Sequence, residues 1–235
     1  MYECQECGGR SGVYLELCPY CLCENTFFPL VGGARRAVKV VDSGIITARE
    51  LKKQGAHKCH LDGPWAQIFP EGFGQPLYIV LWGPPGAGKS TLALKLADTW
   101  AGRALYWPAE EGLGCTVRQR VARLDVQRVD FYVPVSFESL LAQAADYDLI
   151  VVDSAQHSGI DAADYRENFI NAGKSLILTV QIRGDGEMRG GNVYAHESDI
   201  AVETYEYGRF RVDRKNRFGG LFEGVWDDLP GVSGE

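Results

Sequence analysis

The sequence predicts an α/β protein with a mostly parallel sheet, helices on both faces and an antiparallel hairpin at one edge. Three observations lead to this prediction. Apolar runs of strand length alternate with stretches of helix-forming residues. A glycine-rich turn at 83–88 joins the first of these strands to the next helix. Two alternating segments, 199–205 and 208–212, end the pattern with a turn between them, which is typical of a hairpin.

Length and composition narrow the class of protein. The 235 residues suffice for one sizeable domain and a small module, and 46% hydrophobic with 23% charged residues is ordinary for a soluble globular protein. The net charge of −7 means that any nucleic-acid contact needs a local basic patch. No run of about 18 apolar residues suggests a membrane helix, and the N-terminus is unlike a secretory signal. The seven cysteines indicate a reducing cytoplasm and metal ligation rather than disulfides.

The turn at 83–88 begins the pattern G-x-x-x-x-G-K-[ST] between an apolar run at 77–82 and a helix-forming stretch at 92–97. In this setting backbone N–H groups and a helix N-terminus face the phosphates of a nucleoside triphosphate. Lys89 would reach the β- and γ-phosphates, and the Ser90 hydroxyl would hold Mg²⁺. The sequence therefore predicts an ATP site. Its expected residues are Gly83, Pro84, Pro85, Gly86, Ala87, Gly88, Lys89, Ser90 and Thr91.

Residues 1–28 are predicted to form a zinc ribbon. The pairs Cys4/Cys7 and Cys18/Cys21 each have C-x2-C spacing, and two such pairs supply a tetrahedral Zn²⁺ site. A segment of about 25 residues cannot hold a core without metal. Cys23 lies just outside and is interpreted as a bystander or a substitute for Cys21. The ribbon's partner, whether DNA, a protein or none, stays open.

Residues 29–63 are predicted to be a linker, with a helix starting near Thr47. His57, Cys59 and His60 near its end are a conceivable second metal site, but they lack a clear fourth ligand. The ATPase core is expected at 64–220 and an acidic tail at 221–235.

Two carboxylates follow the strand predicted at 103–108. A carboxylate at this end of a strand lies where ligands bind in open α/β sheets. Glu110 would orient and deprotonate the attacking water, with Glu111 as the less favoured substitute. The pair is equally interpreted as a helix N-cap, because an arginine-rich helix is predicted at 116–124.

Later strands add further candidates. A short strand is expected at 129–133. The strand at 149–152 leads into Asp153, which would hold Mg²⁺ through water or Ser90. The strand at 175–180 ends at Gln181, whose amide is suited to sense a γ-phosphate. The glycine-rich segment 182–191 carries Arg183 and Arg189 and is predicted to be a loop that presents cations.

An ordered set of motifs resembles the RadA/Sms family, bacterial RecA-like ATPases that process recombination intermediates. The nucleotide-binding turn and the strand 105–111 ending in two glutamates are part of this set, as are His196 and Asp199. Asp153-Ser154-Ala155-Gln156 is also similar to a family motif. The most specific motifs are Cys4-Gln5-Glu6-Cys7-Gly8 with Cys18-Pro19-Tyr20-Cys21, taken together with the pentapeptide Lys215-Asn216-Arg217-Phe218-Gly219.

The resemblance implies a RecA-like P-loop NTPase core that works as a ring, expected to be a hexamer, with ATP between subunits. Glu110 matches the catalytic glutamate, while Lys215 and Arg217 match residues that reach a neighbour's ATP. The segment 182–191 corresponds to a DNA-facing loop, so Arg183 and Arg189 become DNA-binding candidates. The implied catalytic residues are Lys89, Glu110, Asp153, Gln181, Lys215 and Arg217.

The chain also departs from the family. About 15 residues follow Gly220 where the family carries a Lon-like domain, and Gln181 replaces a usual histidine. These departures suggest a short form, either bacterial or encoded by a phage or mobile element. Three functions are considered: a motor on single-stranded or branched DNA, a nucleotide-switched adaptor that recruits a replicative helicase or recombinase through its zinc ribbon, and an ATP-binding protein without productive hydrolysis.

Overall fold

The structure is a computed structural model that describes residues 2–4, 10–11, 27–29, 58–184, 186–190, 192–218 and 222–226. For the first three segments it describes the backbone alone. These segments are the strands β1 (Tyr2–Cys4), β2 (Arg10–Ser11) and β3 (Phe27–Pro29), which form an antiparallel sheet in the order β2-β1-β3.

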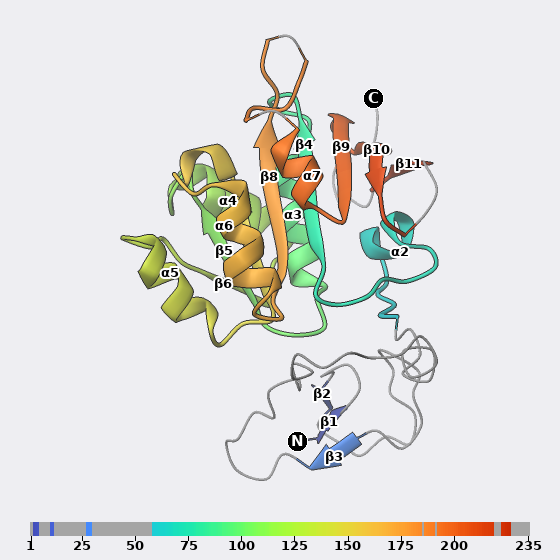
Figure 1. Ribbon diagram of the computed structural model, residues 1–235, viewed down its shortest axis with the longest axis vertical. Helices are drawn as coiled ribbons and strands as arrows, with labels where there is room; N and C mark the ends of the chain where they lie inside the picture. Colours follow the sequence, from blue (N-terminus) through green and yellow to red (C-terminus); the bar gives the residue numbers. More distant parts are fainter. Residues whose placement is uncertain are drawn as a thin grey trace, which may run out of the picture.

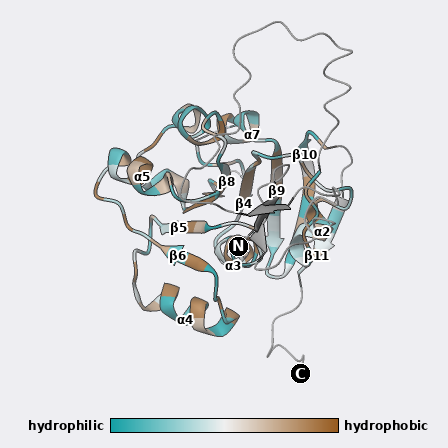
Figure 2. Ribbon diagram, turned by 90° about the horizontal axis from the view of Figure 1, so that it is seen from below, coloured by the Kyte–Doolittle hydropathy of each residue, from teal (hydrophilic) through white to brown (hydrophobic). Residues whose placement is uncertain are grey.

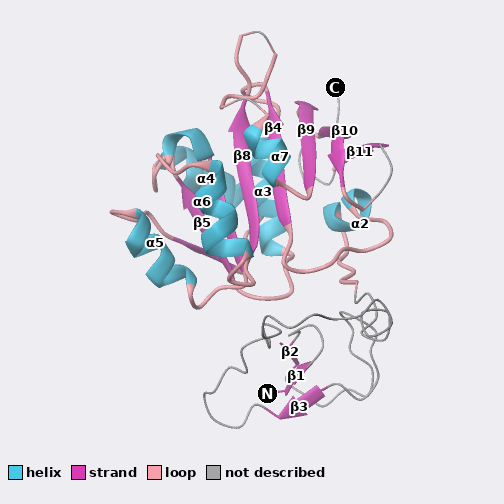
Figure 3. Cartoon of the chain, viewed as in Figure 1, coloured by secondary structure: helices cyan, strands magenta, loops and turns pink. Residues whose placement is uncertain are grey.

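An eight-stranded sheet organises the rest of the described chain (Figure 3). Its strand order is β11-β10-β9-β4-β8-β7-β5-β6. All neighbours from β9 to β6 are parallel, and β10 and β11 pair antiparallel at one edge. The predicted α/β fold with a mostly parallel sheet is thus confirmed. The strands are β4 (Tyr78–Gly83), β5 (Ala104–Pro108), β6 (Val129–Phe131), β7 (Leu149–Asp153), β8 (Ser175–Gln181), β9 (Ile200–Glu206), β10 (Arg209–Asn216) and β11 (Phe222–Val225).

Helices cover both faces of this sheet (Figure 1). One face packs against α2 (Pro64–Ile68), α3 (Lys89–Asp98) and α4 (Cys115–Leu124). The other packs against α5 (Phe137–Ala144), α6 (Ala162–Tyr165), the π-helical turn η2 (Arg166–Ile170) and α7 (Val193–Glu197). Strand residues alternate between the two cores, so that Ile79 and Leu81 face α3 whereas Tyr78 and Val80 face the other layer.

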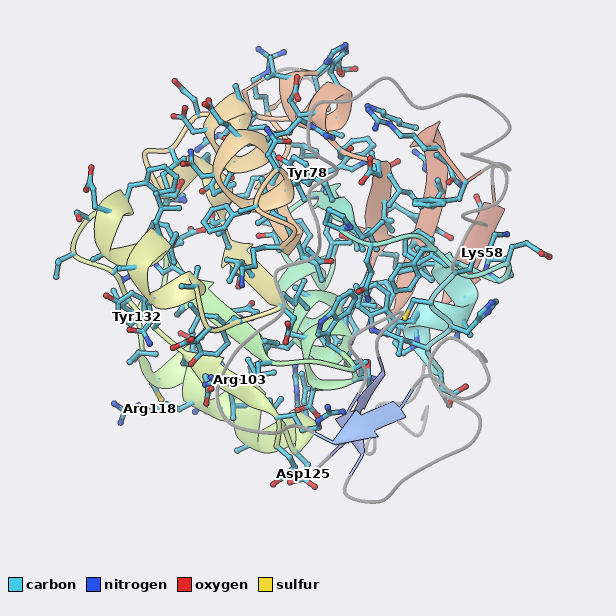
Figure 4. The ribbon with its side chains drawn as sticks, turned by 60° about the horizontal axis from the view of Figure 1, so that its bottom comes forward. Lys58, Tyr78, Arg103, Arg118, Asp125 and Tyr132 are labelled. Atoms are coloured by element: carbon cyan, nitrogen blue, oxygen red, sulfur yellow. The ribbon has the colours of Figure 1, made fainter. Side chains whose placement is uncertain are left out.

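The helix surfaces agree with this layering. In Figure 2, α4 and α5 carry both hydrophobic and hydrophilic residues, as expected of helices with one face on a sheet. Figure 4 shows the charged side chains of Lys58, Arg118 and Asp125 at the periphery, whereas Tyr78 lies among the packed elements. Among the described residues, no helix is long and apolar enough to cross a membrane.

Strand β4 lies in the interior of the sheet, between β9 and β8, and every one of its residues is buried. Its last residue is Gly83, whose φ of 148° and close approach to β9 both require glycine. A Cβ at this position would lie 2.0 Å from the Thr204 carbonyl oxygen. The nucleotide-binding turn therefore leaves the sheet at a point where only a glycine fits.

The sheet continues past residue 220, which corrects the boundary drawn for an acidic tail. Strand β11 pairs with β10 from Arg209↔Val225 to Val212↔Phe222, and Trp226 is buried against Phe210. The acidic residues of 221–235 led to the prediction of a tail, although Phe222, Val225 and Trp226 in this segment are apolar. The core also includes Cys59, which is buried and pairs with Phe73 through backbone hydrogen bonds, although it was assigned to the linker.

The zinc ribbon stays a prediction. Cys7, Cys18 and Cys21 lie outside the described residues, and only the backbone of Cys4 is described. The helix expected near Thr47 and His57 also lie outside them. Cys59 is buried while His60 is exposed, and the described residues contain no group of three or more histidine, cysteine or acidic side chains placed to hold a metal.

Trp65 attaches α2 to the core, and its removal tests how much this short helix contributes. Its ring lies 5.1 Å from Trp100 and 5.2 Å from Phe73, and its indole N–H donates to the Leu96 carbonyl at 2.9 Å. We expect Trp65→Ala to lower the free energy of unfolding by about 3–5 kcal/mol in urea titrations followed by circular dichroism. The exposed Gln67→Ala on the same helix should change it by less than about 0.5 kcal/mol. Equal effects would contradict this account of α2.

Candidate nucleotide site

The candidate site lies at the carboxyl ends of the parallel strands β4, β5, β7 and β8. A cavity of about 340 Å³ opens there. Open α/β sheets bind ligands at this edge because the loops that follow neighbouring strands converge on it. The cavity is lined by Pro85, Gly86, Gly88, Lys89, Ser90, Thr91, Glu110, Glu111, Arg120, Arg123, Asp153, Ser154, Thr179, Gln181 and Tyr207.

The turn before α3 has the conformation of a phosphate-binding loop. Gly88 adopts a left-handed conformation with φ of 88° and precedes the first turn of α3. The Lys89 ammonium donates to the carbonyls of Gly83 and Pro84 at 2.9 and 2.8 Å. Burial lowers the pKa of Lys89, and the nearby carboxylates of Asp153 and Glu110 oppose this shift. The ammonium is thus held over the turn, next to the backbone that would surround a phosphate.

The Asp153 carboxylate accepts three hydrogen bonds at the edge of the cavity. One oxygen accepts from Ser90 at 2.9 Å and from Thr179 at 2.6 Å, and the other accepts from the Tyr106 hydroxyl at 2.6 Å. Burial, followed by the proximity of Asp153, raises the pKa of Tyr106 well above its usual value. The phenol therefore stays protonated and donates a hydrogen bond to Asp153. These contacts orient Asp153 toward Ser90, its predicted partner in holding Mg²⁺.

The two adjacent glutamates have different environments. One oxygen of Glu110 accepts from Ser154 at 2.7 Å and from the Gln181 amide at 2.8 Å. Glu111 forms a two-pronged ion pair with Arg120, both distances being 3.1 Å. The carboxylate of Glu111 is therefore engaged by α4, whereas Glu110 lies beside the predicted γ-phosphate sensor. Neither glutamate is the N-cap of α4, because Gly114 occupies that position.

Lys215 and Arg217 do not line this cavity. Arg217 pairs with Asp199 at 2.9 Å, and the Lys215 ammonium donates to the His196 carbonyl. Burial lowers the pKa of Lys215, as do the neighbouring cations Arg217 and Arg166. A second cavity of about 450 Å³ is bounded in part by Lys215 and His196. The pentapeptide cations thus form a separate group within the chain.

Arg183 and Arg189 are exposed on the segment between β8 and α7, which extends beyond the ends of β4 and β8 (Figure 1). Ile182 and Met188 pair in this segment, and the Arg189 N–H donates to the carbonyl of Gln181 at 2.8 Å. Through Gln181 the segment is directly continuous with the residue that contacts Glu110.

Sequence reasoning missed several residues of the cavity. Thr179 lies inside an apolar strand, so it resembled an ordinary core residue. The same holds for Tyr106, which does not line the cavity but donates a hydrogen bond to Asp153. Arg120 and Arg123 belong to a helix noted for its arginines, but only the packing of α4 brings these two to the cavity. Tyr207 comes from the turn between β9 and β10, far from the nucleotide motif in sequence. No local signal marked it.

The donor set fits MgATP. Magnesium prefers oxygen ligands and commonly takes one or two carboxylates together with substrate phosphates. Ser90 and Asp153 supply a hydroxyl and a carboxylate 2.9 Å apart, beside backbone N–H groups and an ammonium suited to phosphates. These residues would hold the ion, which when bound neutralises charge on the phosphates.

Comparison with known proteins agrees with this description. Residues 75–168 match the model of a family described as AAA domain. The chain is 28% identical to the DNA repair protein RadA of Mycobacterium tuberculosis, across 94% of this chain and 53% of that protein. It is 27% identical to RadA of Aquifex aeolicus (94% and 56%) and 25% identical to RadA of Campylobacter jejuni (95% and 57%). The chain thus spans about half the length of the curated relatives it matches.

The resemblance inferred from the motifs is thereby confirmed, because the similarity extends over nearly all of this chain, and with the P-loop cavity it supports a RadA-like ATPase of the RecA family.

Proposed function

We propose that the chain is a DNA-dependent ATPase, a RadA-type motor that moves along or remodels single-stranded or branched DNA. The observation that carries this proposal is the convergence of Lys89, Asp153 and Glu110, from the ends of three strands, on one cavity of about 340 Å³. Relatives named for DNA repair supply the nucleic-acid part of the proposal.

The residues would divide the work as follows. The turn 83–88 and Lys89 would bind the phosphates, and Ser90 with Asp153 would hold Mg²⁺. Glu110 would orient a water molecule and take its proton. Gln181 would respond to the γ-phosphate, since its amide lies 2.8 Å from Glu110. The segment that begins at Gln181 presents Arg183 and Arg189, which would contact the phosphates of DNA.

Lys215 and Arg217 would act on the ATP of a neighbouring subunit in a ring. Within one chain they lie outside the nucleotide cavity, and the Arg217 side chain is 53% exposed. A cation supplied in trans stabilises the charge of the transferring phosphoryl group. A homo-hexamer would place six such sites at subunit interfaces.

ATP hydrolysis with and without single-stranded DNA is the principal test. We expect DNA to stimulate the steady-state rate several-fold and Lys89→Ala to abolish it, because the phosphates lose their ammonium. Lys58→Ala is the matched control, since Lys58 lies at the periphery beside α2 (Figure 4). Turnover that DNA does not change would contradict the motor and favour the adaptor that recruits a helicase or recombinase. No turnover at all would contradict the ATPase.

DNA binding by the β8–α7 segment is tested with single charge removals. We expect Arg183→Ala and Arg189→Ala to weaken binding of a fluorescent oligothymidine and to make the salt dependence of its affinity shallower, because each removes a phosphate contact. Fluorescence anisotropy at several salt concentrations measures both quantities. Arg118→Ala removes an exposed arginine of α4 that points outward (Figure 4) and should change neither. Losses of equal size in all three variants would contradict a specific DNA contact.

The trans role of Arg217 is tested by complementation. We expect Arg217→Ala to bind a fluorescent ATP analogue normally but to lose about a thousandfold or more in hydrolysis. Mixing it with inactive Lys89→Ala should restore hydrolysis at roughly a quarter of the sites, where an intact cavity meets an intact arginine from the other variant. Full activity of Arg217→Ala, or no recovery in mixed assemblies that size-exclusion chromatography shows to form, would contradict this role.

A further inference from the structure

A polar cluster beside Glu110 is centred on the Ser154 hydroxyl. Ser154 directly follows β7, is 4% exposed and has a left-handed backbone with φ of 72°, which residues other than glycine rarely adopt. Such strained conformations are retained where the surrounding structure imposes them, commonly at functional sites. The hydroxyl lies 2.7 Å from Glu110, 2.8 Å from the Gln156 amide and 2.8 Å from Nδ1 of His157.

Counting protons in this cluster assigns the role of the His157 ring. A hydroxyl has one proton to donate and two lone pairs to accept with. An ionised Glu110 can only accept, so it takes the Ser154 proton. The Gln156 NH₂ group occupies one lone pair. The contact between the Ser154 hydroxyl and Nδ1 of His157 is then a hydrogen bond only if Nδ1 carries a proton. Nδ1 donates that hydrogen bond to the second lone pair of the hydroxyl.

The His157 ring also acts on Glu110 through its charge. Nδ1 lies 3.5 Å from the same Glu110 oxygen that Ser154 contacts. Among the described residues, Glu110 is the one carboxylate within 4 Å of the His157 ring nitrogens. The other partners of this Glu110 oxygen, Ser154 and Gln181, are neutral. The Lys89 ammonium, at the start of α3, is a further cation that interacts with Glu110. The His157 side chain is 40% exposed, so its free nitrogen can exchange protons with solvent.

From this geometry we propose that His157 is a positioning residue that acts through Ser154 on Glu110, and that protonation of His157 slows ATP hydrolysis. The inference rests on the proposed ATPase activity. The neutral ring holds Ser154, and hence Glu110, in place. A proton at Nε2 leaves the bond to Ser154 intact but adds a positive charge beside the carboxylate. That charge makes Glu110 a weaker base for the attacking water.

The direction of the pH effect follows from this charge. Histidine is the side chain whose charge ordinarily changes between about pH 5 and 8. A positive charge on the His157 ring therefore decreases the hydrolysis rate, so the rate should fall toward acidic pH. We expect the rate at saturating MgATP to be about three- to tenfold lower at pH 5.5 than at pH 8, the size expected for one charge at this distance in a partly exposed site.

The decisive variant is His157→Asn, whose amide nitrogen can replace the donor at Nδ1 but cannot become charged. We expect it to keep the wild-type hydrolysis rate at pH 8 within about twofold and to lose most of the decline at pH 5.5. His60→Asn removes an exposed histidine that the proposal does not involve and should keep the wild-type profile. His157→Ala removes donor and charge together. It should be slower than wild type at pH 8 by roughly three- to tenfold, short of the hundredfold that a displacement of about 1 Å can cost.

Nitrogen NMR of ¹⁵N-labelled wild-type protein reports the protonation of the histidine rings directly, and it requires no enzymatic activity. The signals of four histidines are expected, and the one absent in His157→Asn is His157. At pH 8 its Nδ1 should carry the proton. A ring protonated at Nε2 instead, or an acidic decline that persists unchanged in His157→Asn, would overturn this inference alone. A wild-type protein without hydrolysis at any pH would overturn it together with the proposed function.

Discussion

The buried carboxylate of Asp153 is the group on which the arrangement of the site depends. It is 5% exposed and lies at the end of β7. A buried charge is costly unless hydrogen bonds or opposite charges compensate it, and here the partners come from four different elements. Ser90 belongs to α3, Tyr106 to β5 and Thr179 to β8, while the Arg120 guanidinium of α4 lies 3.9 Å away. Satisfying this one carboxylate therefore fixes the nucleotide turn, the strand before Glu110 and the strand that ends in Gln181 relative to one another.

The sheet makes this convergence possible. Apolar layers on both faces hold β4, β8, β7 and β5 in parallel, so that their carboxyl ends meet along one edge. The antiparallel edge contributes as well, because Trp226 and Tyr207 pack beside the turn before α3. A Cβ added at Gly88 would lie 2.8 Å from the Trp226 ring and 3.2 Å from the Tyr207 ring. The conformation of the nucleotide turn is thus supported from outside by residues about 120 and 140 positions away in sequence.

The sequence predicted the strands of the core because their apolar runs are continuous and bounded by glycine, proline or charge. It also predicted the positions of Lys89, Ser90 and Asp153, since motif and strand end coincide. It favoured Glu110 over Glu111, although adjacent residues share nearly every local signal, and the ion pair between Arg120 and Glu111 now distinguishes the two side chains. Short elements were not predicted, because they are too short to show a clear sequence pattern. Helices α6 and α7 have four and five residues and no amphipathic period long enough to detect, and β11 lies in an acidic segment.

One buried carboxylate also connects the pentapeptide to the nucleotide turn. Asp199 accepts at one oxygen from Arg217 at 2.9 Å, and at the other from the backbone N–H of Tyr78, also at 2.9 Å. Tyr78 is the first residue of β4, and Gly83, where the nucleotide turn begins, is its last. The strand is wholly buried and uninterrupted, so its two ends cannot shift independently. To serve the ATP of a neighbouring subunit, as proposed, Arg217 would have to move away from Asp199. Asp199 would then lose a charge partner at the start of β4, and the other end of β4 carries the chain's own phosphate-binding turn. A single strand would then connect the proposed catalytic cation of one subunit to that subunit's own nucleotide turn.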